Sequence, residues 1–482
     1  MQLHSIISNL LFIKPEIILL CVSLFALLYG LFVNKCHVKF ILLCGMIVSM
    51  QQLFVTALPE SIFIFNNSLL LNDTTQILRI LILSASILCM LFMMQYKIEF
   101  EIPILMTIST LSLMLMVASN DLMTMYLAME VSSLTMYICV ASNKGSYFST
   151  EAGLKYFILG SVASAIFLFG TSIISGFTGS FAFDVIGTYT IDTLDGDFLP
   201  IIFIFSGCMI LTAFFFKMAV APFHAWIADV YNGAPWYITL FIGSVSKIAM
   251  CGLLVRCVFS LFDTLNIHVQ NILLIVSILS IFIGSIGAVL QNDLKRILAY
   301  SSVSNIGFAM AGIVSGSIHG IASGFVYIVL YTLLMFIPVF ILISILSNAK
   351  NSHSIVLSDL AELSTYYPYK TACLAILMFA TAGLPPFAGF FGKFHILMHI
   401  IAQDMEVLSI LFILGAIIST FYCLRIIKNI YFVKTTTYTT VLVTNTTFEF
   451  TMIYMIGLLN ISYSIYSSEC ITFFSELFRK LL

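Results

Sequence analysis

Long apolar runs dominate the chain, and short polar segments separate them. A helix needs about 20 mainly apolar residues to cross the hydrocarbon core of a bilayer. On this length, the pattern predicts about fourteen transmembrane helices and therefore an all-α polytopic membrane protein. The predicted helices cover residues 14–33, 40–58, 76–96, 102–119, 121–142, 152–178, 199–222, 235–260, 268–290, 297–315, 320–347, 371–401, 405–431 and 448–468.

Composition agrees with this fold class. Of the 482 residues, 61% are hydrophobic and 9% are charged, whereas soluble domains contain about 25% charged residues. The longest polar stretches, near 179–199 and 348–370, are too short to form a soluble domain. The 11 cysteines include no CxxC pair, and no phosphate loop or dinucleotide motif is present. We therefore expect no cofactor, no metal and no nucleic-acid partner.

Charged residues between the predicted helices separate by sign. One set of alternate loops contains Lys35, Lys39, Lys97, Lys144, Lys295 and Arg425. The other set contains Asp73, Asp121, Asp184 and Asp404. Loops on the cytoplasmic or matrix side carry the excess of Lys and Arg, so the first set is predicted to face that side. Because the two sets alternate along the chain, the number of helices is predicted to be even. Both termini are then predicted to lie on the side opposite the basic loops.

Two predicted helices contain helix breakers at matched places. Lys217 lies five residues before Pro222, and Pro385 and Pro386 precede Lys393. Proline removes a backbone donor and clashes with the preceding turn. Interrupted helices at corresponding places in two halves indicate an antiporter-like inverted repeat. The predicted parts are an N-terminal three-helix segment (1–100), a first five-helix repeat (101–262), a second five-helix repeat (263–433) and a C-terminal helix (434–482).

Four lysines and one glutamate inside the predicted helices are the candidate site residues: Glu130, Lys155, Lys217, Lys247 and Lys393. A charge at mid-bilayer costs at least a few kcal/mol and is usually functional. The set indicates a buried path for protons, in which we predict an ion pair between Glu130 and Lys217 and a central relay at Lys247. The alternatives are snorkelling for Lys155 and Lys217, and a carboxylate capped by neighbouring serine hydroxyls for Glu130.

Histidines near the two breaks are secondary candidates. His395 and His399 are spaced i,i+4 and share a helix face. A metal site would need a third ligand, so a polar stripe beside Lys393 that carries water or protons is favoured. His224 follows Pro222, and two interpretations stay open: it gates the basic-side entrance, or it is a hydrogen-bonded loop histidine.

Several runs between about residues 100 and 430 resemble subunit 2 of respiratory complex I, the proton-pumping NADH–ubiquinone oxidoreductase. They are SNDLMTMYLAMEVSSLTMYI, EAGLKYFILG, FFFKMAVAPFHAW, QNDLKRILAYSSVSNIGFAMAGI and AGLPPFAGFFGKF. The resemblance implies an antiporter-like fold of fourteen helices. It also implies that Glu130 is the fifth-helix carboxylate, and that the lysines of helices six, seven, eight and twelve are Lys155, Lys217, Lys247 and Lys393.

In this family these residues form a hydrated axis that transfers protons, while NADH oxidation and quinone reduction belong to other subunits. The chain would thus be a subunit of an H⁺-translocating NADH:ubiquinone reductase. Two positions depart from the family pattern. Asn305 stands where the tenth helix usually has a histidine, and Asn232 replaces an acid in the run YNGAP. Asparagine holds water but cannot accept a proton, so a relay at residue 305 needs water or another route.

The resemblance implies partners and a location as well. The expected partners are the neighbouring antiporter-like subunit 4, the small subunit 4L, supernumerary subunits and phospholipids. The 44 phenylalanines and the resemblance favour the mitochondrial inner membrane, with a bacterial plasma membrane as the alternative. Two rival functions remain: an Mrp-type cation/proton antiporter subunit, and a structural membrane subunit whose lysines only pack.

Overall fold

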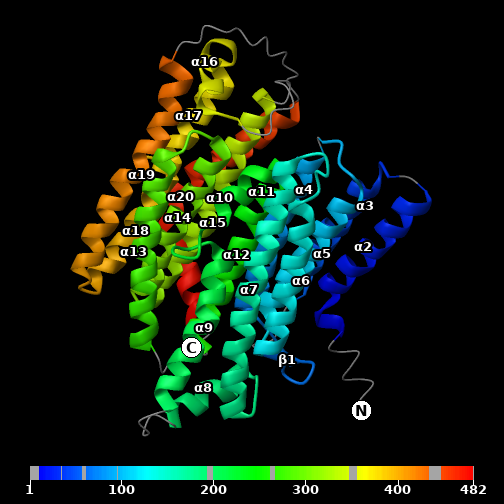
Figure 1. Ribbon diagram of the computed structural model, residues 1–482, viewed down its shortest axis with the longest axis vertical. Helices are drawn as coiled ribbons and strands as arrows, with labels where there is room; N and C mark the ends of the chain where they lie inside the picture. Colours follow the sequence, from blue (N-terminus) through cyan, green and yellow to red (C-terminus); the bar gives the residue numbers. More distant parts are fainter. Residues whose placement is uncertain are drawn as a thin grey trace. The chain divides into compact units, whose positions relative to one another are not determined.

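The computed structural model of the chain is almost entirely helical (Figure 1). It comprises two compact units, described separately below. The first is Met1–Met218, Tyr237–Val269 and Lys480–Leu482, and the second is Ala219–Trp236 and Gln270–Arg479. The structure describes residues 10–33, 35–56, 61–94, 96–192, 199–260, 266–346, 355–433 and 447–480.

The first unit begins with packed helices that pair in chain order, α2 with α3, α3 with α4, and α5 with α6 (Figure 1). Between α3 and α4 a short antiparallel hairpin places Ser61 of β1 opposite Asn72 of β2. The elements are α2 (Lys14–Phe32), α3 (Val38–Val55), β1 (Ser61–Ile64), β2 (Leu69–Asn72), α4 (Asp73–Met93), α5 (Glu101–Ala118), α6 (Leu122–Val140), α7 (Tyr147–Thr178), α8 (Phe183–Asp192), α9 (Leu199–Met218), α11 (Trp236–Gly243) and α12 (Val245–Ser260).

In the second unit α15 contacts α14, α17, α18 and α20, so it lies at the centre of the unit. The first helix of this unit is α10 (Ile227–Gly233). The chain then passes through α11 and α12 of the first unit and returns with α13 (Asn266–Leu290). The remaining elements are α14 (Leu294–Val314), α15 (Ile318–Leu346), η2 (Leu357–Leu360), α16 (Leu363–Tyr366), α17 (Pro368–Ala382), α18 (Ala388–Ala402), α19 (Glu406–Phe432) and α20 (Thr447–Arg479).

The predicted all-α membrane fold is confirmed. Among the described residues, 12 helices are long and apolar enough to cross a membrane, so fourteen is an approximate count. The apolar run predicted as 371–401 consists of two shorter helices, α17 and α18. The hairpin and α8 were not predicted, because both lie between the predicted transmembrane helices, in segments too short or too polar to cross a membrane. The repeat boundary predicted at 262/263 falls outside the described residues and stays a prediction.

Both predicted interruptions are present. Helix α9 ends at Met218, followed by Ala219 with φ +58°, and α10 begins only at Ile227. Helix α17 ends at Ala382, followed by Gly383 with φ +85°, and α18 begins at Ala388. Glycine adopts this left-handed conformation without the steric penalty of a side chain. Each break leaves backbone groups near a lysine without their helical partners.

A third interruption was not predicted. Helix α11 ends at Gly243 and α12 starts at Val245, so the regular helix is interrupted at Ser244, three residues before Lys247. The Ser244 hydroxyl donates to the carbonyl of Leu240 at 2.6 Å. Gly243 was the local signal for this break, but no proline accompanies it.

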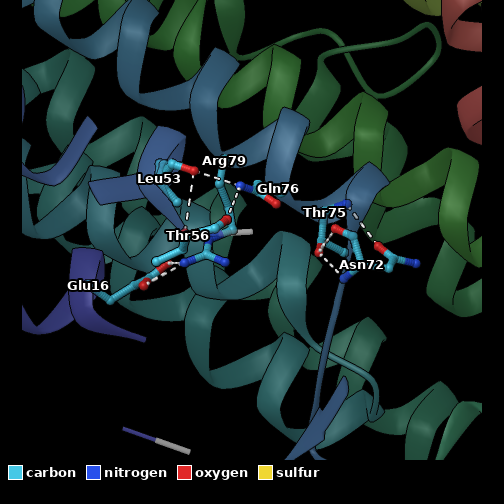
Figure 2. A network of polar contacts seen from close by, with 7 residues as sticks. All are labelled: Glu16, Leu53, Thr56, Asn72, Thr75, Gln76 and Arg79. Carbon is cyan, nitrogen blue, oxygen red and sulfur yellow. Dashed lines mark hydrogen bonds and ion pairs between the residues drawn. The ribbon is translucent and has the colours of Figure 1, made fainter. Parts of the chain in front are cut away.

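A buried polar network joins the first helices (Figure 2). The Arg79 guanidinium of α4 lies 2.6 Å from the Glu16 carboxylate of α2, and both side chains are almost fully buried. One turn earlier, Gln76 donates to the carbonyls of Leu53 and Thr56 at the end of α3. Asn72 caps the start of α4. Helix α4 is thus fastened to α2 and α3 by polar bonds as well as by apolar packing.

Replacing Arg79 with methionine should destabilise the first unit by about 3–5 kcal/mol, because it leaves the Glu16 charge buried and unpaired. The thermal unfolding of the purified protein in detergent measures this effect. The double variant Glu16→Leu/Arg79→Met is the matched control and should recover most of the loss, since an apolar pair needs no counterion. Equal unfolding temperatures for wild type and Arg79→Met would show that the ion pair contributes nothing to stability.

Candidate functional site

Glu130 and Lys217 lie in the first unit on α6 and α9. The Glu130 carboxylate accepts hydrogen bonds from Ser164 of α7 at 2.8 Å and from Ser133 at 3.3 Å. The Lys217 Nζ is buried and makes no hydrogen bond to any described residue. It lies 5.8 Å from the centroid of the Tyr137 ring, a weak cation–π distance. The ammonium therefore has only long-range partners.

The structure shows no bonded contact between Glu130 and Lys217, so their predicted ion pair stays a prediction. The two groups interact electrostatically, yet Lys217 has no bonded partner among the described residues. The reason is that hydroxyl donors on α6 and α7 already bind the carboxylate. Hydrogen bonds from neutral donors stabilise a carboxylate without neutralising its charge. The serine-capped alternative thus describes the local bonding, while the charge of Glu130 still acts on Lys217.

Lys247 lies on α12, also in the first unit, and is 2% exposed. Its Nζ makes no hydrogen bond to any described residue. A side chain this deeply buried does not reach an interface, so snorkelling is excluded as an explanation. An isolated buried ammonium is costly, which favours either bound water or loss of the proton. Its predicted role as the central relay stays a prediction.

Lys393 lies in the second unit on α18 and is solvated by the break that precedes it. Its Nζ donates to the carbonyl of Ala382, the last residue of α17, at 3.1 Å and to the Ser419 hydroxyl at 3.1 Å. The ring of Phe308 lies 4.6 Å away. A carbonyl at the end of the interrupted helix thus solvates this lysine. The acceptors that hold Lys393 are neutral, so its charge is stabilised without a carboxylate.

Lys155 differs from the other lysines. It forms an i,i+4 ion pair with Glu151 on α7 at 2.8 Å, and 43% of its side chain is exposed. Exposed pairs of this kind contribute about 0–1 kcal/mol. The sequence reading placed Lys155 only a few residues inside its helix, and the structure gives it a surface position on that helix rather than a buried one.

The secondary candidates occupy three places in the second unit. His224 lies in the turn between the break after α9 and the start of α10, and burial lowers its pKa from the ordinary value. The Nε2 of His395 lies 3.2 Å from the Ser467 hydroxyl of α20. The ring of His399 stacks on His319 with centroids 6.0 Å apart. Asn305 of α14 accepts a hydrogen bond from Tyr327 at 2.7 Å.

No group of three or more His, Cys, Asp and Glu side chains that could hold a metal occurs among the residues that the structure describes. His395 and His399, the i,i+4 pair, instead have separate polar partners. The favoured interpretation of these residues as a polar stripe leading away from Lys393 stays a prediction.

One site residue was assigned wrongly from the sequence. Lys295 was counted as a basic loop residue, but it is 6% exposed at the first turn of α14. Its Nζ donates to the carbonyl of Ala234 at 2.5 Å and lies 5.0 Å from the centroid of the Trp236 ring. A cation is favoured at a helix C-terminus, and here Lys295 holds the end of α10. Lys295 is far from Ala234 and Trp236 in the sequence, so no local pattern predicted their contact.

Residues 119–419 match the family model described as "NADH:quinone oxidoreductase/Mrp antiporter, TM". The chain belongs to this family. The matched range contains all five predicted site residues and all three helix interruptions. The antiporter-like fold predicted from the matched breaks is therefore the fold of this family.

Curated relatives and solved structures agree with the family match. The "NADH-quinone oxidoreductase subunit N" of Parvibaculum lavamentivorans is 34% identical over 425 residues, which cover 87% of each chain. That of Pelagibacter ubique is 34% identical over 439 residues, covering 89% of this chain and 90% of the relative. Both relatives are bacterial, so the family placement is supported without the mitochondrial detail.

Among solved structures, a chain of respiratory complex I from Thermus thermophilus with bound aureothin has a TM-score of 0.77 at 22% identity. The match covers 95% of this chain and 98% of that chain. A chain of the Mrp complex from Dietzia has a TM-score of 0.81 at 16% identity and covers 100% and 98%. At these identities the likeness establishes the shared antiporter-like fold alone.

Proposed function

We propose that the chain is a membrane subunit of a proton-translocating NADH:quinone oxidoreductase and that it transfers protons along Glu130, Lys217, Lys247 and Lys393. One observation carries the proposal. Three lysines are buried in membrane helices, each beside a helix interruption, and none has a carboxylate bonded to its Nζ among the described residues. Such lysines are unfavourable as packing residues and suitable as carriers that exchange protons.

The chemistry of each group follows from its surroundings. Lys217 and Lys247 lack bonded acceptors among the described residues. Lys393 instead donates to two neutral acceptors. The Glu130 charge acts on Lys217, so a change at Glu130 would alter the electrostatic surroundings of that amine. In the proposal the groups exchange protons and therefore titrate together.

The redox reactions lie outside this chain in the proposal. We expect no cofactor here, since the sequence contains no motif for one. Electron transfer to quinone in other subunits would change a charge near one end of the lysine series and so release protons along it. Lys155 lies apart from the buried series on the exposed side of α7, where it is paired with Glu151. The proposal includes Lys155 as a further proton-transfer residue of the axis.

An Mrp-type cation/proton antiporter subunit is the second candidate. The family description names both systems, and the Mrp complex of Dietzia has the same fold. The curated relatives cited above are named as oxidoreductase subunits, which favours the first candidate. A purely structural subunit is the third, and the unpartnered buried amines of Lys217 and Lys247 argue against it.

We further propose a multi-pass location in a respiratory membrane with both termini opposite the basic loops. The assignment to the mitochondrial inner membrane rests on composition and on the resemblance to subunit 2. The bacterial relatives instead fit a location in a plasma membrane. The proposed partners are the adjoining antiporter-like subunit 4, the small subunit 4L, supernumerary subunits and phospholipids.

The experiment that tests this function is purification of the chain from its own membranes through an affinity tag, followed by reconstitution into sealed vesicles. The proposal expects NADH dehydrogenase activity to co-purify and NADH to drive proton movement into the vesicles. A preparation that exchanges Na⁺ for protons without NADH, and that carries no NADH-oxidising subunits, would establish the antiporter function instead.

A further inference from the structure

Buried hydroxyl groups gather around Asn305 in the second unit. The Asn305 amide donates to the carbonyl of Ser301 at 2.8 Å, and its Oδ1 accepts from the Tyr327 hydroxyl at 2.7 Å. These two bonds fix the orientation of the amide. Tyr331 of α15 and Tyr422 of α19 lie near the same amide. Three helices thus each place a polar side chain at one buried point.

The three tyrosines are nearly inaccessible, at 3% for Tyr327, 5% for Tyr331 and 4% for Tyr422. Tyr327 and Tyr331 are spaced i,i+4 on α15, so they share one face of that helix. The Tyr331 hydroxyl donates only to the sulfur of Met335, a weak acceptor. Its oxygen therefore keeps the capacity to accept a proton and to donate one elsewhere.

This tyrosine cluster extends toward Lys393. The ring of Tyr327 packs against Gly392, where a Cβ atom would come within 2.7 Å of the ring. Gly392 directly precedes Lys393. Cys423, the neighbour of Tyr422, lies near Lys393 and near Tyr331. The absence of a side chain at residue 392 thus admits the Tyr327 ring beside the residue that precedes the lysine.

The cluster also extends toward the segment that follows the first break. Tyr231 of α10 is 1% exposed, and its hydroxyl makes no hydrogen bond to any described residue. It interacts with Tyr331 and lies near Ser302. A buried hydroxyl without a partner is costly, and bound water is the usual remedy. Tyr231, Tyr331 and Tyr327 therefore mark a row of hydroxyls between α10 and Lys393.

We propose that these tyrosine hydroxyls, with bound water, relay protons to and from Lys393, and that Asn305 acts as their positioning residue. In each step a tyrosine oxygen accepts a proton while its own hydroxyl proton passes to the next oxygen or to the Lys393 amine. One O–H bond forms as another breaks, and no tyrosine carries a net charge afterwards. The relay thus needs no titratable side chain at residue 305. The inference rests on the proposed function and identifies further residues for it.

Tyrosine-to-phenylalanine substitutions test the relay, since they remove the hydroxyl and keep the packed ring. Tyr331→Phe and Tyr327→Phe, introduced into the chain within its assembled complex, should each lower the NADH-driven proton-pumping rate by about tenfold. A positioned proton-transfer group typically contributes about 10²–10⁴-fold, and bound water should replace part of it here. Tyr367→Phe at the start of α17 is the matched control, being buried in the same unit but outside the cluster, and should pump as wild type does.

A rescue experiment separates a relay from a packing role. The double variants Asn305→His/Tyr331→Phe and Asn305→His/Tyr327→Phe should regain most of the lost pumping, because an imidazole accepts and donates protons itself. Loss of pumping that the histidine does not restore would assign the hydroxyls a structural role and overturn the relay. Normal pumping in both single phenylalanine variants would overturn it as well.

Measuring Lys247→Met in parallel distinguishes a failure of the tyrosine relay from a failure of the proposed function. If Lys247→Met is impaired while both phenylalanine variants pump normally, the relay is wrong and the proposed function stands. If Lys247→Met assembles and pumps normally, the proposed lysine pathway itself is wrong.

Discussion

Replacing Lys247 with methionine should slow coupled NADH–quinone turnover by about a hundredfold or more, the contribution expected of an essential proton-transfer group. Methionine is similarly long and apolar, so it suits a site that is 2% exposed. The variant should therefore assemble. NADH oxidation by an artificial acceptor should stay near the wild-type rate, since it does not require the membrane subunits in the proposed complex. Spectrophotometric rates of the two reactions in the same membranes measure this separation.

Two further variants define what Lys247 does. Lys247→Arg should also be impaired, because arginine hardly ever releases its proton. Lys428→Met is the matched control, because Lys428 is an exposed lysine on α19, and it should turn over normally. If Lys247→Arg were fully active, a fixed positive charge would suffice, and proton exchange at this residue would be excluded.

Replacing Glu130 with glutamine should lower coupled turnover by about tenfold or more, by removing the negative charge that acts on Lys217. Glutamine keeps the size of the side chain and still accepts a hydrogen bond from Ser164 through its amide oxygen. The loss would therefore report the charge and not the packing. Turnover of NADH with quinone, normalised to the amount of assembled complex, is the measurement.

Glu151→Gln supplies the control for this substitution. Glu151 lies on α7, is 36% exposed and pairs with Lys155. An exposed pair contributes about 0–1 kcal/mol, so this variant should behave as wild type does. Equal losses in Glu130→Gln and Glu151→Gln would mean that general changes of charge, and not the buried site, determine turnover.

Local signals in the sequence predicted two of the three helix interruptions and the burial of Lys247 and Lys393. Proline and glycine act on their own backbone, so Pro385, Pro386 and Gly383 predicted the break before Lys393 without any knowledge of the fold. Likewise, Lys247 lies far from both ends of an apolar run, so its burial followed from its position. Both predictions needed only neighbouring residues, and the structure confirms both.

Contacts between distant segments were not accessible in the same way. Glu16 and Arg79 lie 63 residues apart, and the sequence around either residue does not indicate that the other is its partner. The hydrogen bond from Ser164, on another helix, to the Glu130 carboxylate was likewise not predicted. The tyrosines around Asn305 come from two further helices, although the i,i+4 spacing of Tyr327 and Tyr331 was a visible signal of a shared face.

The number of protons moved per NADH oxidised, in sealed vesicles containing the complex, tests most directly whether protons pass through the buried lysines. A short NADH pulse and an external pH indicator give this ratio for wild type and for Lys247→Met from the same preparation. The proposed pathway predicts that the methionine variant assembles fully but moves fewer protons per NADH, or oxidises no NADH with quinone at all. Full assembly with the wild-type ratio at the wild-type rate would contradict it.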